Sequence, residues 1–412
     1  MKNLFFLLVL IFIWFFIDGL YAQGYWYQQI SGTGQGLYGI YFTDANTGTA
    51  VGTYGTILRT TNGGETWTTQ NSGTSNVHLF DVAFINSNTG IAVGIVGTVL
   101  RTTNSGETWT SQTSGIIPAL FSVSFADENN GTVVGHTGII LRTTDGGINW
   151  EQKPNAPTTL RAVHFADESS GFAVGDNGLV MRTTDGGANW FEQTSGIQIN
   201  LQGVYFTDGN TGAIVGGNNL TGARIYHTSN AGSSWMLQKS IPNVALTDVH
   251  FTDSNSGTAV GWEGIILNTS DGGTTWLSQF SNSTTTLLSV FFVNSEFGFV
   301  AGSIGTILAK ADSGVTSVTG ETPAEEFVLH QNYPNPFNSG TTINVFVPEE
   351  NTLLSLKIYN SLGQEVETLI NQVAPAGNHE FKFEAGTLSS GVYFYVMKAG
   401  NFQDTKKLIL LK

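Results

Sequence analysis

The sequence predicts an all-β protein in which a seven-bladed β-propeller is followed by a small immunoglobulin-like β-sandwich. Three observations lead to this prediction. A short phrase, first written RTTNGGETW at residues 59–67, recurs about every forty residues. Each repeat contains four short segments of strand-forming residues separated by Gly, Asn and Asp turns. After about residue 316 the repeats stop, and short alternating strands of a different composition follow.

The composition indicates an extracellular chain and excludes several classes of function. Of the 412 residues only 11% are charged, 51 are Gly and none is Cys, so disulfides, thiolate metal sites and Cys nucleophiles are excluded. The formal net charge is −15, with no run of Lys or Arg. Nucleic-acid binding needs a basic surface, so no nucleic-acid partner is expected. Acidic membrane surfaces are unfavourable partners for the same reason.

The first 22 residues have the organisation of a secretory signal peptide. Lys2 precedes the apolar run LFFLLVLIFIWFFI, and the small residue Ala22 offers a cleavage position that would leave Gln23 at the mature N-terminus. The run is short for a membrane span, and an uncleaved anchor is the alternative interpretation. We therefore expect Sec export into a periplasm.

The repeats are expected to form blades between residues 23 and 316. A first strand such as LYGIYF (37–42) leads through a turn such as TDANTG to a second strand, a minimal loop and a third strand such as TILRT. The recurring phrase comes next, and its Trp begins the fourth strand. Helical repeats of this length would show helical periodicity, which is absent. The seven predicted first strands begin at Leu37, Leu79, Leu120, Leu160, Leu201, Leu246 and Leu287.

One fourth strand is missing at the end of the array, because six copies of the phrase accompany seven first strands. The N-terminal stretch YWYQQISGT, with Trp26, matches TWTTQNSGT, with Trp67. We expect this N-terminal strand to complete blade 7, which would leave no free sheet edge between the first and last blades. The predicted divisions are a signal peptide at 1–22, the propeller at 23–316, a linker at 317–326 and a C-terminal domain at 327–412.

The recurring phrase is predicted to be structural. Its pattern, S/T-x-D/N-x-G-x-T/N-W, resembles the Asp-box of sialidase-like and related bacterial propellers. The Asn or Asp is expected to accept backbone N–H bonds and fix the turn, and the Trp to cover the outer part of the blade. Repetition argues against catalysis, since one active site needs one constellation. The predicted Asp-box residues are Asn62, Trp67, Asn104, Trp109, Asp145, Trp150, Asp185, Trp190, Asn230, Trp235, Asp271 and Trp276.

The repeat array also resembles the seven-bladed photosystem II stability and assembly factor family. The shared features are G-x-A-V-G, G-x-I-L-R-T-T-D/N-G-G and the Trp that follows. This resemblance implies the fold more strongly than the function, because proteins with these repeats occur in non-photosynthetic bacteria. Nothing else in the sequence points to a photosystem.

The C-terminal stretch resembles the type IX secretion C-terminal sorting domain, type A. The matching motifs are YNSLG at 359–363, AG at 376–377, SGVY at 390–393, a Lys-containing final strand, and the leading motif Tyr333, Pro334, Asn335, Pro336, Phe337 and Asn338. The resemblance implies a Gram-negative envelope of the Bacteroidota type. It also implies export to the outer-membrane surface or beyond by the type IX secretion machinery, whose sortase-like peptidase removes the tail. A carbohydrate-binding sandwich is the alternative.

A ligand is expected on the propeller face that carries the loops between second and third strands. These loops keep their flanking glycines while their centres vary, which suits a binding face but also suits surface loops that drift. No catalytic residue, metal site or cofactor is predicted; oxygen-rich turns such as DANTG lack a bidentate Glu and are expected to be hairpin turns. The predicted ligand-binding residues are Tyr54, His136, Asp176, Asn218, Trp262 and Glu263.

The sequence thus favours a secreted or cell-surface propeller that serves as a binding, adhesion or assembly scaffold for an unidentified glycan or protein ligand. We expect a monomer. The alternative is an extracellular glycoside hydrolase of the sialidase-like or xyloglucanase-like propeller type. That enzyme needs two carboxylates within about 10 Å, whereas Asp81 and Asp248 fall in blades 2 and 6. A sialidase also needs an arginine cluster. The same position in successive repeats is occupied by Arg59, Arg101, Arg142 and Arg182, so we expect these arginines to be spread around the ring and not gathered.

Overall fold

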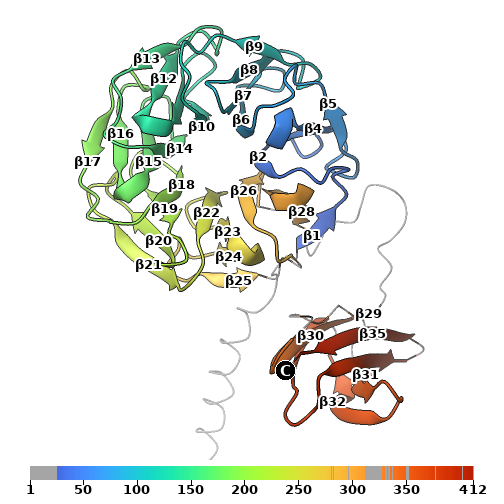
Figure 1. The fold of residues 1–412 in the computed structure, drawn as a ribbon. Helices are drawn as coiled ribbons and strands as arrows, with labels where there is room; N and C mark the ends of the chain where they lie inside the picture. Colours follow the sequence, from blue (N-terminus) through green and yellow to red (C-terminus); the bar gives the residue numbers. More distant parts are fainter. Residues whose placement is uncertain are drawn as a thin grey trace, which may run out of the picture. The chain divides into compact units, whose positions relative to one another are not determined.

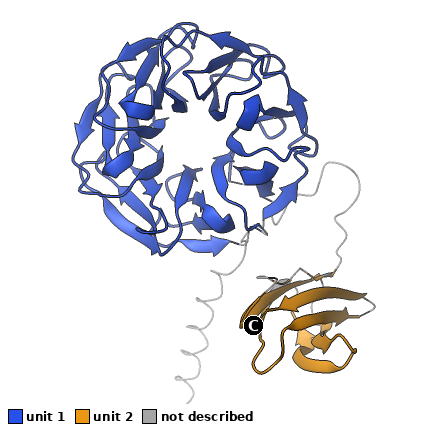
Figure 2. Ribbon diagram, in the orientation of Figure 1, with its two compact units in different colours: residues 1–313 blue, residues 314–412 orange. Residues whose placement is uncertain are grey.

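A ring of seven sheets and a two-sheet sandwich make up the part of the chain that the structure describes (Figure 1). The structure is a computed structural model that describes residues 26–279, 281, 283–295, 297–310, 327–329, 332, 335, 337–348, 352–375, 377–400 and 402–411. The expected signal peptide, Gln23 and the 317–326 linker lie outside the described residues. Residues 1–313 and 314–412 form two compact units (Figure 2). Within the described ranges, no helix has the length and apolar character needed to cross a membrane.

Each blade is a four-stranded antiparallel sheet with its first strand nearest the ring axis (Figure 1), which confirms the predicted seven-bladed fold. Blade 1 contains β2 (Leu37–Phe42), β3 (Gly48–Gly52), β4 (Ile57–Thr60) and β5 (Thr68–Gln70). Blade 2 contains β6 (Leu79–Phe84), β7 (Gly90–Gly94), β8 (Val99–Thr102) and β9 (Thr110–Gln112). Blade 3 contains β10 (Leu120–Phe125), β11 (Gly131–Gly135), β12 (Ile140–Thr143) and β13 (Glu151–Lys153).

The remaining four blades repeat this arrangement. Blade 4 contains β14 (Leu160–Phe165), β15 (Gly171–Gly175), β16 (Val180–Thr183) and β17 (Phe191–Gln193). Blade 5 contains β18 (Leu201–Phe206), β19 (Gly212–Gly216), β20 (Ala223–Thr228) and β21 (Met236–Ile241). Blade 6 contains β22 (Leu246–Phe251), β23 (Gly257–Gly261), β24 (Ile266–Thr269) and β25 (Leu277–Gln279). Blade 7 contains β26 (Leu287–Phe292), β27 (Gly298–Gly302), β28 (Ile307–Lys310) and β1 (Trp26–Gln29).

The inner strands form because their residues are buried on both faces by the neighbouring blades. All five residues of β3 are buried, whereas the three residues of β5 at the outer edge are exposed or half-buried. The second strand begins with Gly because an aromatic ring of the first strand lies against it: a Cβ on Gly48 would come within 2.4 Å of the Phe42 ring. Continuous apolar runs in these strands therefore reflect two-sided burial.

The two kinds of polar turn are closed by side-chain oxygens. In the hairpin between first and second strands, Asp44 Oδ1 accepts the backbone N–H groups of Asn46 and Thr47 at 2.8 and 2.9 Å. The oxygen-rich turns are therefore hairpin caps. In the recurring phrase, Thr60 Oγ1 accepts Gly64 N–H at 2.9 Å, and Asn62 Oδ1 accepts Thr66 N–H at 3.0 Å. The same pair of bonds recurs in the other five copies of the phrase.

The arginines beside the phrase join neighbouring blades. Arg59 Nε donates to Ser105 O in blade 2 at 2.7 Å, and Arg101 Nε donates to Gly146 O in blade 3 at 3.0 Å. Arg142 Nε makes the corresponding bond to blade 4. In each case the acceptor is the carbonyl directly after the Asn or Asp of the next turn. With Arg182 in blade 4, these arginines lie one to a blade in four successive blades and do not gather in one cluster.

A glutamine three residues after the Trp takes over at the other blade junctions. Gln193 Nε2 donates to Ala231 O, joining blades 4 and 5 at 3.0 Å. In blades 6 and 7, the indole N–H of the Trp instead donates back to the Gln of the preceding blade, from Trp276 to Gln238 and from Trp26 to Gln279. Every junction around the ring therefore has a side-chain hydrogen bond near its outer edge.

Blade 7 is assembled from both ends of the propeller. β1 pairs antiparallel with β28, and Trp26 lies opposite Lys310. Trp26 is 2% exposed, packs edge-on against Phe292 at 5.8 Å between ring centroids, and donates its indole N–H to Gln279 Oε1 at 2.9 Å. Gln29 accepts the indole N–H of Trp67 and donates to Gly63 O, which joins blades 7 and 1. The N-terminal strand therefore makes contacts on both sides of blade 7.

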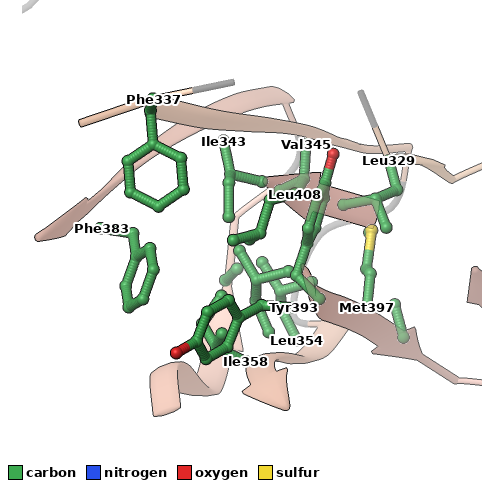
Figure 3. Close-up of a cluster of buried hydrophobic side chains, with 14 of the residues drawn as sticks. Leu329, Phe337, Ile343, Val345, Leu354, Ile358, Phe383, Tyr393, Met397 and Leu408 are labelled. Atoms are coloured by element: carbon green, nitrogen blue, oxygen red, sulfur yellow. The ribbon is translucent and has the colours of Figure 1, made fainter. Parts of the chain in front are cut away.

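The sandwich packs two antiparallel sheets around one apolar core. One sheet has the order β29 (Val328–Leu329), β30 (Gly340–Val347) and β33 (Gly377–Glu384). The other has the order β32 (Glu365–Ala374), β31 (Thr352–Asn360), β34 (Gly391–Ala399) and β35 (Phe402–Leu410). Phe337, Ile343, Phe383 and Met397 are among the core side chains in Figure 3.

The leading motif of the C-terminal domain fastens the last strand to the sandwich. Asn335 Oδ1 accepts Ile409 N–H at 2.8 Å, and its Nδ2 donates to Lys407 O at 3.1 Å. Phe337 N–H donates to Ile409 O, and its ring is buried against Phe383. Asn338 is exposed. Of the other motif residues, the placements of Tyr333, Pro334 and Pro336 are outside the described residues.

Closure of the ring by β1 gives the first testable prediction. Trp26→Ala should lower the free energy of unfolding by about 3–5 kcal/mol, the usual cost of removing a large buried aromatic side chain. Tyr27→Ala, on the same strand, is the matched control because Tyr27 is 45% exposed, and it should change stability by less than about 1 kcal/mol. Chemical denaturation of the full chain measures both; equal effects of the two substitutions would contradict the closure.

Candidate ligand-binding face

The loop face is the end of the ring that carries the loops between second and third strands and the segments that link successive blades. Five of the loops are short 3₁₀ turns: η1 (Thr53–Gly55), η2 (His136–Gly138), η3 (Asp176–Gly178), η4 (Trp262–Gly264) and η5 (Ser303–Gly305). Each ends in a Gly with positive φ that lies against an inter-blade link. A Cβ on Gly55 would lie 2.3 Å from Thr74 O. The absence of a side chain at these glycines therefore lets each loop pack closely against an inter-blade link.

The six sequence-predicted ligand residues lie in these loops, but they do not converge on one point. Tyr54, His136 and Glu263 are exposed at the tips of blades 1, 3 and 6, and Trp262 is 37% exposed beside Glu263. Asn218 belongs to the larger loop of blade 5, where its Oδ1 accepts the N–H groups of Leu220 and Thr221. Asn218 thus shapes its own loop.

Asp176 and Tyr54 make specific contacts on this face. Asp176 forms a two-point ion pair with Arg161, at 2.7 and 3.2 Å between nitrogen and oxygen. The Tyr54 ring meets His78, in the next inter-blade link, with 5.2 Å between ring centroids. The carboxylate of Asp176 is therefore already paired, while the ring of Tyr54 remains 60% exposed.

An aromatic arc at the second position of the first strands was missed by the sequence analysis. Tyr38, Phe80 and Phe121, from blades 1, 2 and 3, are half-buried and meet edge-on at 5.3 Å between successive centroids. The Arg161 guanidinium lies 5.7 Å from the Phe121 centroid and ends the arc in blade 4. The signal was available, because this position is aromatic in three successive repeats and changes to Arg in the fourth.

Two carboxylates lie deeper, on the innermost strands. Asp81 accepts N–H groups from Val82 and from Val123 in the next blade, and also the Ser122 hydroxyl. Asp248 makes the equivalent backbone bonds to Val249 and, in blade 7, Val290. Each carboxylate therefore accepts backbone N–H groups at the unpaired inner edges of two first strands. In this way it joins neighbouring blades at the inner end of their junction.

The inner carboxyls and imidazoles are shifted in opposite directions by burial. Burial raises the pKa of Asp81 to about 6 and that of Asp248 to about 7, with a contribution at Asp248 from the negative charge of Asp81. Burial lowers the pKa of His164 to about 4 and that of His250 to about 3. The two imidazoles form a collar of tilted and edge-on rings with Tyr41, Tyr205 and Phe291, with 4.2–5.2 Å between successive centroids. Both histidines are therefore neutral in the folded protein at neutral pH.

No metal site is evident where side chains are placed: within the described ranges, no group of three or more His, Asp or Glu side chains could hold a metal ion. A groove does occur on the sandwich, lined by residues that include Tyr359, Phe394, Val396 and Lys398. It lies on a different unit from the loop face.

Opposed titrations at the ring centre give the second prediction. A carboxyl with a raised pKa stabilises the fold below about pH 4, and this stabilisation is lost as the pH rises through its folded pKa. A histidine with a lowered pKa behaves oppositely: its stabilisation is present above about pH 6.5 and is lost as the pH falls through its folded pKa. Asp81→Asn/Asp248→Asn should therefore make stability fall on acidification from about pH 6.5 to 4, by up to roughly 1.4 kcal/mol per pH unit for each histidine.

The wild-type protein should show a flatter profile over the same range, because its carboxyl and histidine contributions offset each other. Melting temperatures of the full chain at half-unit pH steps measure this. Asp253→Asn is a suitable control, because hydrogen bonds lower the pKa of Asp253 and it does not titrate within the window. If the double variant showed the same stability profile as the wild type, ionisation of the inner carboxyls would be excluded as the cause of the flat wild-type profile.

Comparisons with known proteins agree with this architecture. Residues 21–115, 69–159, 152–244 and 238–319 match the family model of the photosynthesis system II assembly factor YCF48, and residues 331–411 match that of the secretion system C-terminal sorting domain. No curated protein sequence matches the chain.

Solved structures share the fold at low sequence identity. A structure described as YCF48 bound to D1 peptide is 20% identical, with a TM-score of 0.60 over 70% of this chain and 98% of that one. YCF48 from Cyanidioschyzon merolae is 22% identical, with a TM-score of 0.59 over 70% and 99%. PorZ of Porphyromonas gingivalis, described as an essential surface component of the type IX secretion system, is 13% identical, with a TM-score of 0.54. That comparison covers 92% of this chain and 60% of PorZ.

Proposed function

The chain belongs to the photosynthesis system II assembly factor YCF48 family, and from this premise we propose that its propeller is a binding and assembly scaffold displayed outside the cell. Its C-terminal domain is a secretion system sorting domain of the kind that directs type IX export to the cell surface or the extracellular space. We further propose a preceding Sec step, removal of the tail by the sortase-like peptidase of that machinery, and a monomeric product.

The binding part of this proposal rests on the difference between repeat positions that serve folding and loop positions that do not. The features common to the repeats go into packing, turn closure and bonds between blades, as in the turn at Thr60 and the bond from Arg59. The loop centres differ from blade to blade and are exposed at Tyr54 and Glu263. Positions that folding leaves free are where recognition is usually placed. A related structure described with a bound peptide supports a protein ligand, and a glycan remains the second ligand class.

A glycoside hydrolase is the rival function, and its acid pair would have to come from groups such as Asp81 and Asp248. Both carboxylates accept backbone hydrogen bonds from two blades, which supports a structural role for them. An array of glycans and peptides probed with the full chain separates the proposals. Specific retention without release of reducing sugar supports the scaffold, and turnover of a retained glycan supports the hydrolase.

The export proposal gives the third prediction. A chain that ends at residue 325 should remain in the periplasm of a Bacteroidota host, because it lacks the C-terminal sorting domain. An unrelated signal-bearing passenger fused to residues 326–412 should reach the cell surface. The mature surface form should end within about residues 311–326, a range that contains the boundary of the two units. Peptide mass spectrometry of surface-released protein reads this end directly. Recovery of peptides from Leu388–Leu411 on the mature product would show that the tail is retained.

A positioning variant tests whether export needs a folded tail. Asn335→Ala removes both bonds from the motif to β35 and should lower the melting temperature of the sorting domain. Asn338→Ala is the matched control, because Asn338 belongs to the same motif and is exposed. Lower surface yield for Asn335→Ala alone would support recognition of the folded sandwich, whereas equal yields would contradict it.

A further inference from the structure

Three loop tips on adjacent blades combine exposure with an unfavourable backbone conformation. Tyr54 in blade 1, Val96 in blade 2 and Ile304 in blade 7 occupy the same loop position, with φ of 55–56°. Their side chains are 60%, 63% and 72% exposed. Gly and Asn adopt this left-handed region readily, whereas β-branched and bulky residues do so rarely. Folding alone therefore favours a different residue at all three tips.

Blade 4 shows that the favourable residue fits this loop. Asn177 occupies the same position with φ of 59°, between the same flanking glycines. The other tips of this type are Thr137 in blade 3 and Glu263 in blade 6, both with φ of 58°. Large apolar side chains at the position are thus confined to three consecutive blades, where they are neither buried nor conformationally favoured.

Two further exposed residues extend this surface. Ile117 is 78% exposed in the link from blade 2 to blade 3, next to Pro118, whose carbonyl accepts the N–H of Gly97 in the blade 2 tip. Ile30 is 85% exposed at the start of the link from blade 7 to blade 1. That link lies against Gly305, which follows Ile304. We call Ile30, Tyr54, Val96, Ile117 and Ile304 the apolar crescent.

Charged residue types are absent from the loops and links around the apolar crescent, where His78 is the one histidine. The loops and links that hold it contain no Asp, Glu, Lys or Arg at residues 30–38, 53–56, 71–80, 95–98, 113–121 and 303–306. The charged side chains Arg161, Asp176 and Glu263 belong instead to blades 4 and 6. These three charged side chains therefore lie on blades outside the crescent, where Leu220 of blade 5 and Trp262 of blade 6 are also exposed.

We propose that the apolar crescent is a docking surface for an extended, uncharged segment of another polypeptide that carries apolar side chains. This proposal deepens the proposed function, on which it rests, by assigning a ligand class to one part of the loop face. Four of the five crescent residues are aliphatic, so Tyr54 alone offers a flat ring on which a sugar could stack. With no cation in the crescent and a net charge of −15, an anionic lipid or lipopolysaccharide surface would be repelled.

The test uses the unfavourable backbone conformation of the three tips to separate an effect on binding from an effect on stability. The full chain is used to select random peptides displayed on phage, and the enriched peptides are synthesised for affinity measurements. Selected peptides should be apolar and uncharged. Tyr54→Asn/Val96→Asn/Ile304→Asn should weaken their binding by at least about thirtyfold, as for loss of central contacts. Its melting temperature should stay the same or rise, since Asn suits the conformation of all three tips.

The matched control is Thr137→Asn, which makes the same substitution at the same loop position outside the crescent. It should leave peptide affinity within about twofold. Ile30→Ser/Ile117→Ser provides a second loss-of-binding variant that leaves every loop tip unchanged. Peptide binding retained by both crescent variants, enrichment of charged peptides, or no enrichment would overturn the proposal.

Two parallel measurements distinguish the other ligand classes. Binding of the crescent to phosphatidylcholine vesicles or to a neutral-glycan array, abolished by the triple Asn variant, would overturn the polypeptide assignment. Ligand binding that depends only on Glu263 or Asp176 would also overturn it, but would leave the propeller as a binding scaffold. Absence of any ligand in all three formats would contradict the scaffold function as well.

Discussion

Apolar packing between neighbouring blades is the interaction on which the ring most depends, since a buried cluster spans each of the seven junctions. A hydrogen bond near the outer edge of each junction adds a directional link. The inner strands of neighbouring blades pack closely, and the outer edges need a specific link to hold each blade at its angle. Blades 1 to 3 use an arginine of the third strand, as in the bond from Arg101 to Gly146. Where that position holds His227, Asn268 or Ala309, a glutamine of the outer strand makes the link instead. Blade 4 has both residues: Gln193 makes the bond, and Arg182 lies over the Phe172 ring.

The repeat pattern was sufficient to predict the fold, because each blade obeys the same local rules. Turn closure by Asn62 and its equivalents follows from residue type, and two-sided burial follows from apolar runs such as that of β3. The bonds between blades could not be predicted in the same way. They join residues about forty positions apart through a geometry that only the closed ring defines, so Arg59 could be placed on the circumference but not given a partner.

The candidate site was predicted less completely than the fold. Reasoning from residue chemistry selected Tyr54, Asp176 and Glu263 because they vary within a constant frame, but it gave no weight to aliphatic tips such as Val96 and Ile304. Their significance appears only when exposure and backbone conformation are known together. Asp176 looked like a free ligand group in the sequence, whereas the structure pairs it with Arg161. Whether these residues bind anything stays a prediction, as does the structural assignment of the recurring phrase.

The split origin of blade 7 also constrains when the protein can become a ring. Trp26 and Gln279 are joined by a hydrogen bond across 253 positions of sequence, so this contact cannot form until nearly the whole propeller is present. Contacts of such long sequence separation form slowly, because most of the chain must be ordered before they can close. A chain delivered from its N-terminus would carry β1 unpaired while every other blade is completed. Closure thus requires a complete propeller. A truncated or stalled chain keeps an unpaired strand edge, and this edge is paired only when β28 has formed.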